Sequence, residues 1–290
     1  MKVRNLDFSI TIVGLGLIGG SYAMALRELN PKNLWAIDIN EESIQYAEVS
    51  GIIDKGYIDA SIPLKQSDIV IISLYPEDAV KFIKNNVENF KEGAIITDVS
   101  GIKEKIVNEV ELFIPDYLDF VAGHPMAGRE ASGIGYASKD IFKNANYIIT
   151  PTDKNKKENI NIIKKLAYDI GCNNVIEVTP ELHDKYVAYT SGVPHIIAAA
   201  LMNSDSFDNE KGYFVGGSFR DATRVALINS SLWTELFVSN KENIIRELEE
   251  FQNNLAELKE AVKNEDTIEM KKLFDNASKK RSELNDKKQN

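Results

Sequence analysis

Ser9-Ile-Thr-Ile-Val-Gly14-Leu-Gly16-Leu-Ile-Gly19-Gly20 stands near the start of the chain. The β-branched residues predict a strand, and the glycines that follow have the spacing Gly-x-Gly-x-x-Gly at the start of a helix. Gly14 permits a tight turn, Gly16 lets the backbone approach a pyrophosphate, and Gly19 lets the helix pack closely on the strand. Free amides at the helix start then bind phosphate. The residues expected to line a bound dinucleotide are Gly14, Leu15, Gly16, Leu17, Ile18 and Gly19.

Asp38 is the expected partner of the adenosine ribose. It ends the next apolar run, nineteen residues after Gly19, where a carboxylate accepts hydrogen bonds from the ribose hydroxyls. A carboxylate there would repel a 2′-phosphate, so NAD is favoured over NADP. Two alternatives stay open: a glycine-rich turn without a ligand, and Asp38 as a helix cap before Glu41.

Short apolar runs alternate with segments of helical period as far as Val178. Runs without polar alternation suit strands that are covered on both faces, and strand-helix-strand order implies parallel pairing. We therefore predict an α/β fold: a doubly wound parallel sheet of Rossmann type, followed by an all-helical domain. The predicted domains are residues 1–179 and 180–290. The predicted strands are Ser9–Val13, Leu34–Ile39, Ile69–Leu74, Ala94–Val99, Leu118–Ala122, Tyr147–Thr150 and Val175–Val178.

The region after Pro180 reads as helical throughout. A long apolar helix over Glu181–Ser204 should be interrupted near Gly192 and Pro194, and helical period continues over Ser218–Ser239. From Ile244 to Val262 apolar residues are spaced alternately by four and three, which is typical of a helix pair or a subunit interface. Spacing alone does not favour either the helix pair or the subunit interface. The polar tail from Ser278 to Asn290 is expected to be frayed.

Composition excludes several classes of protein. The 290 residues are 43% hydrophobic and 27% charged, with a net charge of −10. Such a chain is globular, and non-specific binding to nucleic acid or an anionic membrane is not expected. Neither a membrane-spanning run nor a signal peptide is seen, so a cytoplasmic protein is expected. Cys172 alone excludes internal disulfides and thiolate clusters, and it reads as an inert apolar residue. Three scattered histidines predict no metal site.

Ligands of such sheets bind beyond the carboxyl ends of the strands. His124 follows the fifth predicted strand, and Pro125 restricts its backbone toward an extended form. A histidine presented there can accept a hydroxyl proton near neutral pH. His183 reads as a surface residue, and His195 reads as a hydrogen-bonded core residue.

A second cluster, Gly216–Arg224, places Arg220 and Arg224 four residues apart on one helix face. An acidic protein needs local cations to hold an anionic substrate, and arginine can bind both oxygens of a carboxylate. Lys103 is a further candidate cation near the mouth of this predicted substrate site. Equally, the arginines could be surface residues paired with Asp221 or Glu235.

With these motifs the chain resembles the prephenate dehydrogenases and the related arogenate dehydrogenases. The resemblance runs in order from about Ile10 to Asn243 and is most specific at His-Pro-Met-Ala-Gly and Gly-Gly-Ser-Phe-Arg-Asp-Ala-Thr-Arg. The matching segments are Gly14–Gly19, Thr97–Lys103, Gly123–Gly128, Ser191–His195 and Gly216–Arg224 with Trp233.

The resemblance implies NAD-dependent oxidative decarboxylation of prephenate to 4-hydroxyphenylpyruvate and carbon dioxide, on the way to tyrosine. It implies that His124 hydrogen-bonds the ring hydroxyl, that Arg224 binds the ring carboxylate, and that His195 helps hold the substrate. It also implies a homodimer formed through the helical domain.

The chain departs from the family pattern at two positions. The family serine falls at Gly101, where Ser100 or a water could replace it, and a family histidine falls at Gly192. Three other functions remain open. They are an arogenate dehydrogenase, a 3-hydroxyacid or imino-acid oxidoreductase of similar plan, and an NAD-binding sensor without turnover.

Overall fold

The computed structural model describes residues 6–206 and 210–286, with side chains described as far as Leu284. Its contacts group the chain into two compact units, residues 1–240 and residues 241–290. The domain boundary expected near residue 179 stays a prediction. Among the described residues, no helix is both long and apolar enough to cross a membrane.

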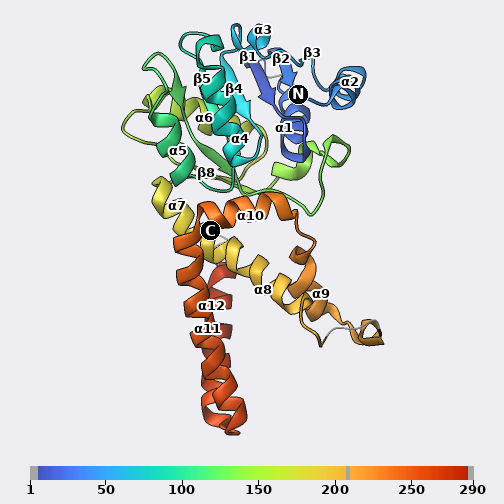
Figure 1. The fold of residues 1–290 in the computed structure, drawn as a ribbon, viewed down its shortest axis with the longest axis vertical. Helices are drawn as coiled ribbons and strands as arrows, with labels where there is room; N and C mark the ends of the chain where they lie inside the picture. The colour runs from blue at the N-terminus through green and yellow to red at the C-terminus, as the bar shows by residue number, and fades with distance from the viewer. Residues whose placement is uncertain (1–5, 207–209, 287–290) are drawn as a thin grey trace. The chain divides into compact units, whose positions relative to one another are not determined.

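A six-stranded parallel sheet forms the centre of the first unit (Figure 1). Its strand order is β3-β2-β1-β4-β5-β6, in which the chain runs outward from β1 to one edge and then from β4 to the other. This order is that of a dinucleotide-binding sheet, and it confirms the predicted fold class. The strands are β1 (Leu6–Val13), β2 (Pro31–Ile37), β3 (Lys55–Tyr57), β4 (Ile69–Ile72), β5 (Ile95–Asp98) and β6 (Asp119–Phe120).

The sheet is buried on both faces because its apolar strands alternate between two cores. In β4, Ile69 and Ile71 join one core, whereas Val70 and Ile72 join the other. Successive side chains of a strand point to opposite faces, so an unbroken apolar run needs a cover on each side. The first core includes residues of α1 and α6, and the second includes residues of α4 and α5.

The helices of the sheet region lie between the apolar runs, where helical period was predicted, except that α3 was not predicted. Asn40 caps α2 by accepting a hydrogen bond from the Ser43 N–H, and Pro76 occupies the first turn of α4. These helices are α1 (Leu17–Arg27), α2 (Glu41–Val49), α3 (Ser61–Leu64), α4 (Pro76–Asn85), α5 (Glu104–Glu111) and α6 (Lys157–Asp169).

The last two predicted strands do not join the large sheet. They form a separate three-stranded sheet of β7 (Gly123–Pro125), β8 (Asn146–Ile149) and β9 (Asn174–Glu177), in which β7 pairs antiparallel with β8. Neither β3 nor β7 is predicted, because each has only three residues and neither has an apolar run. The consequence for function is that His124 lies on a strand outside the large sheet.

Beyond β9 the described residues form helices only, as predicted. The interruption expected near Gly192 is confirmed as a π-helical turn, Ala188–Gly192, between two helices. The helices of the first unit in this region are α7 (Pro180–Val187), α8 (Val193–Met202), α9 (Gly217–Thr223) and α10 (Ser230–Ser239).

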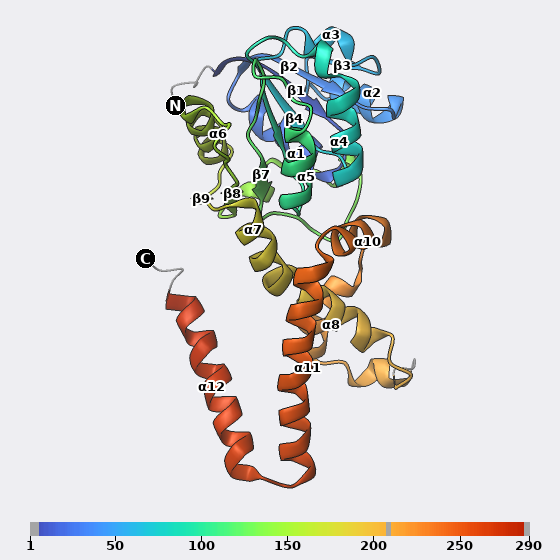
Figure 2. The ribbon, with the colours of Figure 1, turned by 60° about the vertical axis from the view of Figure 1, so that its left-hand side comes forward.

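The second unit is a pair of antiparallel helices, α11 (Lys241–Lys263) and α12 (Thr267–Asp286) (Figure 2). Glu265, with a φ of +53°, lies in the turn that joins them. The expectation of a frayed tail from Ser278 is wrong as far as Asp286, because lysine, arginine, glutamate and leucine there favour helix. The remainder of that tail lies outside the described residues.

Candidate active site

The glycine turn between β1 and α1 has the shape that a pyrophosphate requires. Gly14 has a φ of +91°, and a Cβ there would lie 2.5 Å from the Ser73 carbonyl oxygen. A Cβ on Gly19 would lie 1.8 Å from the Gly14 oxygen, so both positions exclude a side chain. A Cβ on Gly16 would meet nothing within 4 Å. The backbone at Gly16 is therefore open to a ligand.

The start of α1 presents amides to the same space. Gly16 is the N-cap in extended conformation, and no side chain caps the helix. The N–H groups of a first helical turn have no partner within their helix, and together with the helix dipole they favour an anion. Leu17 and Ile18 are half-buried beside it. These features fit the phosphates of a dinucleotide.

Asp38 is half-buried at the end of β2 and holds the glycine turn. Its carboxylate accepts hydrogen bonds from the N–H groups of Leu15, at 2.5 Å, and Asn40, at 2.8 Å. The alternative of Asp38 as the helix cap is wrong, because Asn40 caps α2. Asp38 therefore lies next to the residues expected to bind the cofactor, where a ribose would accompany the phosphates.

The loop after β5 contains a fully buried ion pair between Lys103 and Asp98. Lys103 is therefore not a cation at the mouth of the site, and this expectation is wrong. Its alkyl chain packs inward and its ammonium group pairs with a carboxylate that also accepts the Ser100 and Gly123 N–H groups. Burial lowers the pKa of Lys103, and Asp98 opposes that change.

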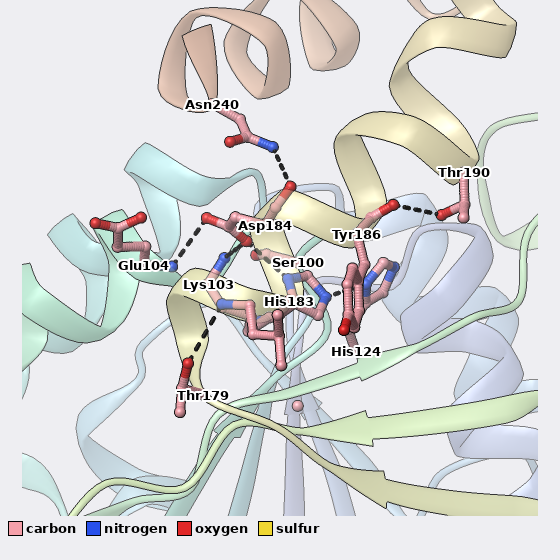
Figure 3. A network of polar contacts seen from close by, with 12 residues as sticks. Ser100, Lys103, Glu104, His124, Thr179, His183, Asp184, Tyr186, Thr190 and Asn240 are labelled. Atoms are coloured by element: carbon pink, nitrogen blue, oxygen red, sulfur yellow. Dashed lines mark hydrogen bonds and ion pairs between the residues drawn. The ribbon is translucent and has the colours of Figure 1, made fainter. Parts of the chain in front are cut away.

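His124 belongs to a buried hydrogen-bonded group (Figure 3). Its Nδ1 lies 2.9 Å from Nε2 of His183, whose Nδ1 lies 2.7 Å from Oδ1 of Asp184. The expectation of a surface His183 is wrong: it is 2% exposed, because α7 turns this face toward the loops after β5 and β6. Burial, His183 and Lys103 together hold the pKa of His124 well below its usual range. A neutral imidazole at pH 7 follows, and it can accept a proton.

The Ser100–Gly101 turn lies against this imidazole. A Cβ on Gly101 would be 3.9 Å from Cε1 of His124 and 3.5 Å from the Leu236 side chain of α10. The Oγ of Ser100 is buried and has no hydrogen-bond partner among the described residues. An unpaired buried hydroxyl is costly and therefore calls for a partner.

His195 and Arg224 lie together in a second group. The His195 ring stacks on Trp233 with 3.6 Å between centroids, and its Nδ1 lies 2.8 Å from the Ser191 carbonyl. Arg224 pairs with Glu130, not with Asp221 or Glu235. Burial lowers the pKa of His195, whereas its bond to Ser191 and the charge of Glu130 oppose that change.

The guanidinium of Arg224 stays largely exposed despite its ion pair, at 63% of its side-chain surface. It is therefore available to an anion that displaces or joins Glu130. Arg220 is exposed on α9, and within the described ranges it shows no hydrogen bond or ion pair to the other site residues. Among the described residues, no cluster of three or more candidate ligands could hold a metal ion.

Sequence reasoning missed His183, Asp184 and Glu130. A signal for the first two was present, because the buried residues of α7 and the turn after it are Pro180, His183, Asp184 and Ala188. This spacing of three, four and eight marks one buried helix face. Glu130 had no such signal, since its partner stands 94 residues later.

Comparison with known proteins identifies the family of this chain. The family model "Prephenate dehydrogenase, nucleotide-binding domain" matches residues 22–176, and "Prephenate dehydrogenase, dimerization domain" matches residues 179–276. A prephenate dehydrogenase of Bacillus subtilis (strain 168) is 32% identical over 276 residues, which are 93% of this chain and 74% of that protein.

Two solved structures share the whole fold. Prephenate dehydrogenase from A. aeolicus, in complex with hydroxyphenyl propionate and NAD+, has a TM-score of 0.86 and 32% identity, covering 98% of this chain and 99% of that one. Synechocystis arogenate dehydrogenase has a TM-score of 0.81 and 26% identity, covering 95% and 99%. Because the family models and the Bacillus relative match most of its length, this chain belongs to the prephenate dehydrogenase family.

Proposed function

We propose that this protein is an NAD-dependent prephenate dehydrogenase, which converts prephenate to 4-hydroxyphenylpyruvate and carbon dioxide in tyrosine biosynthesis. One observation carries the proposal: the half-buried imidazole of His124 lies against the loop that follows β5, at the carboxyl edge of a dinucleotide-binding sheet. The relatives named prephenate dehydrogenase support the same reaction.

The glycine turn fits the cofactor. Gly14, Gly16 and Gly19 shape the turn, and the amides at the start of α1 would hold the phosphates. Asp38 would accept the ribose hydroxyls, which favours NAD over its 2′-phosphorylated form. When bound, NAD supplies a hydride acceptor next to the substrate ring.

His124 acts as the base. Its neutral imidazole accepts the proton of the ring hydroxyl as the ring carbon that carries this hydroxyl becomes a carbonyl. Removal of the proton favours the oxidation. The ring carboxylate leaves as carbon dioxide, and the electron pair of the broken carbon–carbon bond makes the ring aromatic. The proton held by His124 returns to the ring oxygen, which becomes the phenol of the product. The unpaired Ser100 Oγ, beside Gly101, is suited to a hydrogen bond with the same hydroxyl or with a water. In this proposal Ser100, or a water bound to it, takes the place of the family serine that is missing at Gly101.

Arg224 and His195 orient the substrate. The exposed guanidinium of Arg224 would bind the ring carboxylate with both donors, and its role is positioning, since a grip that is too strong would oppose departure. His195, stacked on Trp233, would contact the substrate beside it. Arg220 is proposed as a further cation at the entrance. The absence of a histidine at Gly192 changes the neighbourhood of His195 and leaves His124 intact.

Arogenate is the second candidate substrate. The Synechocystis structure is named arogenate dehydrogenase and shares the whole fold. The two reactions share their ring chemistry and differ in a pyruvyl or an amino acid side chain. Comparing kcat/KM for the two substrates decides between them.

We further propose a homodimer, because residues 179–276 match a model described as a dimerization domain. In this proposal the cofactor binds to residues 1–179, and the dimer contacts lie within residues 180–290. A cytoplasmic location is proposed with the biosynthetic role.

The decisive experiment follows absorbance at 340 nm with prephenate or arogenate and with NAD or NADP. Replacing His124→Asn should lower kcat by roughly 10²–10⁴-fold, the usual contribution of a positioned base, and leave NAD affinity nearly unchanged. A variant with wild-type turnover would remove His124 from the chemistry. A wild-type protein that binds NAD and turns over neither substrate would indicate the sensor instead.

A further inference from the structure

Asp184 lies at the buried end of the group that contains His124. Its Oδ1 accepts the Lys103 N–H at 2.8 Å and its Oδ2 accepts the Glu104 N–H at 3.0 Å. Two backbone donors at the start of α5 stabilise the ionised carboxylate. An ionised carboxylate only accepts hydrogen bonds, so the atom of His183 that faces it, Nδ1, must carry a hydrogen.

His183 is neutral, and this decides the role of its other nitrogen. Burial lowers its pKa, and the charge of Lys103 acts in the same direction, against the raising effects of Asp184 and Asp98. A neutral imidazole has one N–H and one acceptor nitrogen. With the hydrogen on Nδ1, the Nε2 of His183 is the acceptor for whatever faces it.

The atom that faces it is Nδ1 of His124, at 2.9 Å. Nδ1 of His124 must therefore donate, and because this imidazole is also neutral, its Nε2 carries the free lone pair. We propose that His183 and Asp184 are positioning residues that hold His124 in the tautomer whose Nε2 accepts the substrate proton. This inference rests on the proposed function, in which His124 is the base.

The opposite tautomer would be inactive. With the hydrogen on Nε2, His124 would meet the substrate hydroxyl as a donor and could not take its proton. An unassisted neutral histidine populates both tautomers, and the hydrogen bond made by one nitrogen selects the state of the other. When Nε2 takes the proton, the positive charge formed on His124 is linked through His183 to the carboxylate of Asp184, which favours the charged state.

The group of His124, His183 and Asp184 also has a structural role, and any test must separate that role from the positioning of His124. Asp184 caps α5, and its own carbonyl oxygen accepts a hydrogen bond from Nδ2 of Asn240 at 2.8 Å (Figure 3). Substitutions at Asp184 would remove the carboxylate that accepts the two N–H groups at the start of α5, and would therefore disturb that helix as well as His183. His183 is the better position, because within the described part of the chain its ring makes hydrogen bonds to His124 and Asp184 and to no other residue.

The first test reads the tautomer directly and needs neither substrate nor cofactor. The chain has three histidines, so ¹⁵N-labelled imidazoles can be assigned with single variants. Wild-type protein at pH 7.5 should show His124 with a protonated Nδ1 and an unprotonated Nε2. In His183→Phe, which offers no acceptor, His124 should show mixed tautomers or a protonated Nε2. A wild-type His124 protonated on Nε2 would overturn the proposal.

The second test compares His183→Gln with His183→Phe. A glutamine Oε1 can accept from Nδ1 of His124, whereas phenylalanine fills the space without an acceptor. The phenylalanine variant should lose kcat by at least about tenfold, within the roughly 10²–10⁴-fold that a positioned base contributes as a whole. The glutamine variant should recover most of that loss. Thermal unfolding and NAD affinity of each variant report whether the fold is retained.

The pH profile separates positioning from packing. His183→Phe removes the acceptor that stabilises the Nδ1–H of protonated His124. The acid limb of kcat/KM should therefore lie at lower pH in His183→Phe than in His183→Gln, while Lys103, Asp98 and Asp184 remain in place around the pair. Equal kcat values for the two folded variants would overturn the positioning role. If His124→Asn retains wild-type turnover, the proposed function fails instead, and the two failures are thus distinguished.

Discussion

The protonation of His124 sets the pH dependence of the reaction. The base works only when neutral, and its pKa lies well below the usual histidine value because of burial, His183 and Lys103. The active form therefore persists as the pH falls through about 6.5, where an ordinary histidine would be half protonated. We expect kcat/KM to stay level through this pH and to decline only in more acidic buffer. A decline centred at or above 6.5 would contradict the assignment.

Two glycines of the same turn should respond in opposite ways to alanine. Gly19→Ala places a Cβ 1.8 Å from the Gly14 oxygen and should destabilise the fold, with overpacking costing about 1–3 kcal/mol.

Gly16→Ala adds a Cβ in open space, so the melting temperature of this variant should match that of the wild type. Its NAD affinity should nevertheless fall about tenfold, ~1.4 kcal/mol, because the methyl occupies the approach of the phosphates. Calorimetry and NAD titration check both, and unchanged affinity in Gly16→Ala would refute the placement of the pyrophosphate.

The loop between β5 and α5 depends on its buried ion pair. Lys103→Met would leave the Asp98 carboxylate buried without its cation, which costs roughly 3–5 kcal/mol. Urea unfolding should show that loss, and adding Asp98→Asn should recover part of it. Lys105→Met, at the next lysine of the chain, is the matched control. Lys105 is half-buried and pairs with the exposed Glu77, so its loss should change little. A loss below about 1 kcal/mol in Lys103→Met would show that the pair is not needed.

The helix pair α11–α12 leaves apolar side chains on its surface. Leu255 is 53% exposed and Phe274 is 58% exposed, which is consistent with a further partner for this unit. Replacing both with serine should convert the proposed dimer to monomer in light scattering. The polar neighbours Asn253 and Asp275, replaced with serine, serve as the control and should leave the mass unchanged. A wild-type mass of one chain would refute the dimer.

For the molecule as a whole, local spacing predicted the sheet, the cofactor turn and the helical region that follows. The turn at Gly14–Gly19 and the apolar strands are readable because their requirements are local: positive φ, close backbone contact and burial on both faces. His124 was readable for the same reason, as a residue directly after a strand and before a proline. The short strands β3 and β7 carried no such pattern and were missed.

Local spacing could not predict which residues, distant in the sequence, each side chain contacts. His124 meets His183 across 59 residues of chain, and Glu130 meets Arg224 across 94. Lys103 looked like a surface cation and is fully buried against Asp98. Burial and hydrogen bonding between distant segments depend on how helices and loops pack, and that packing alone gives His124 its neutral state and its partners.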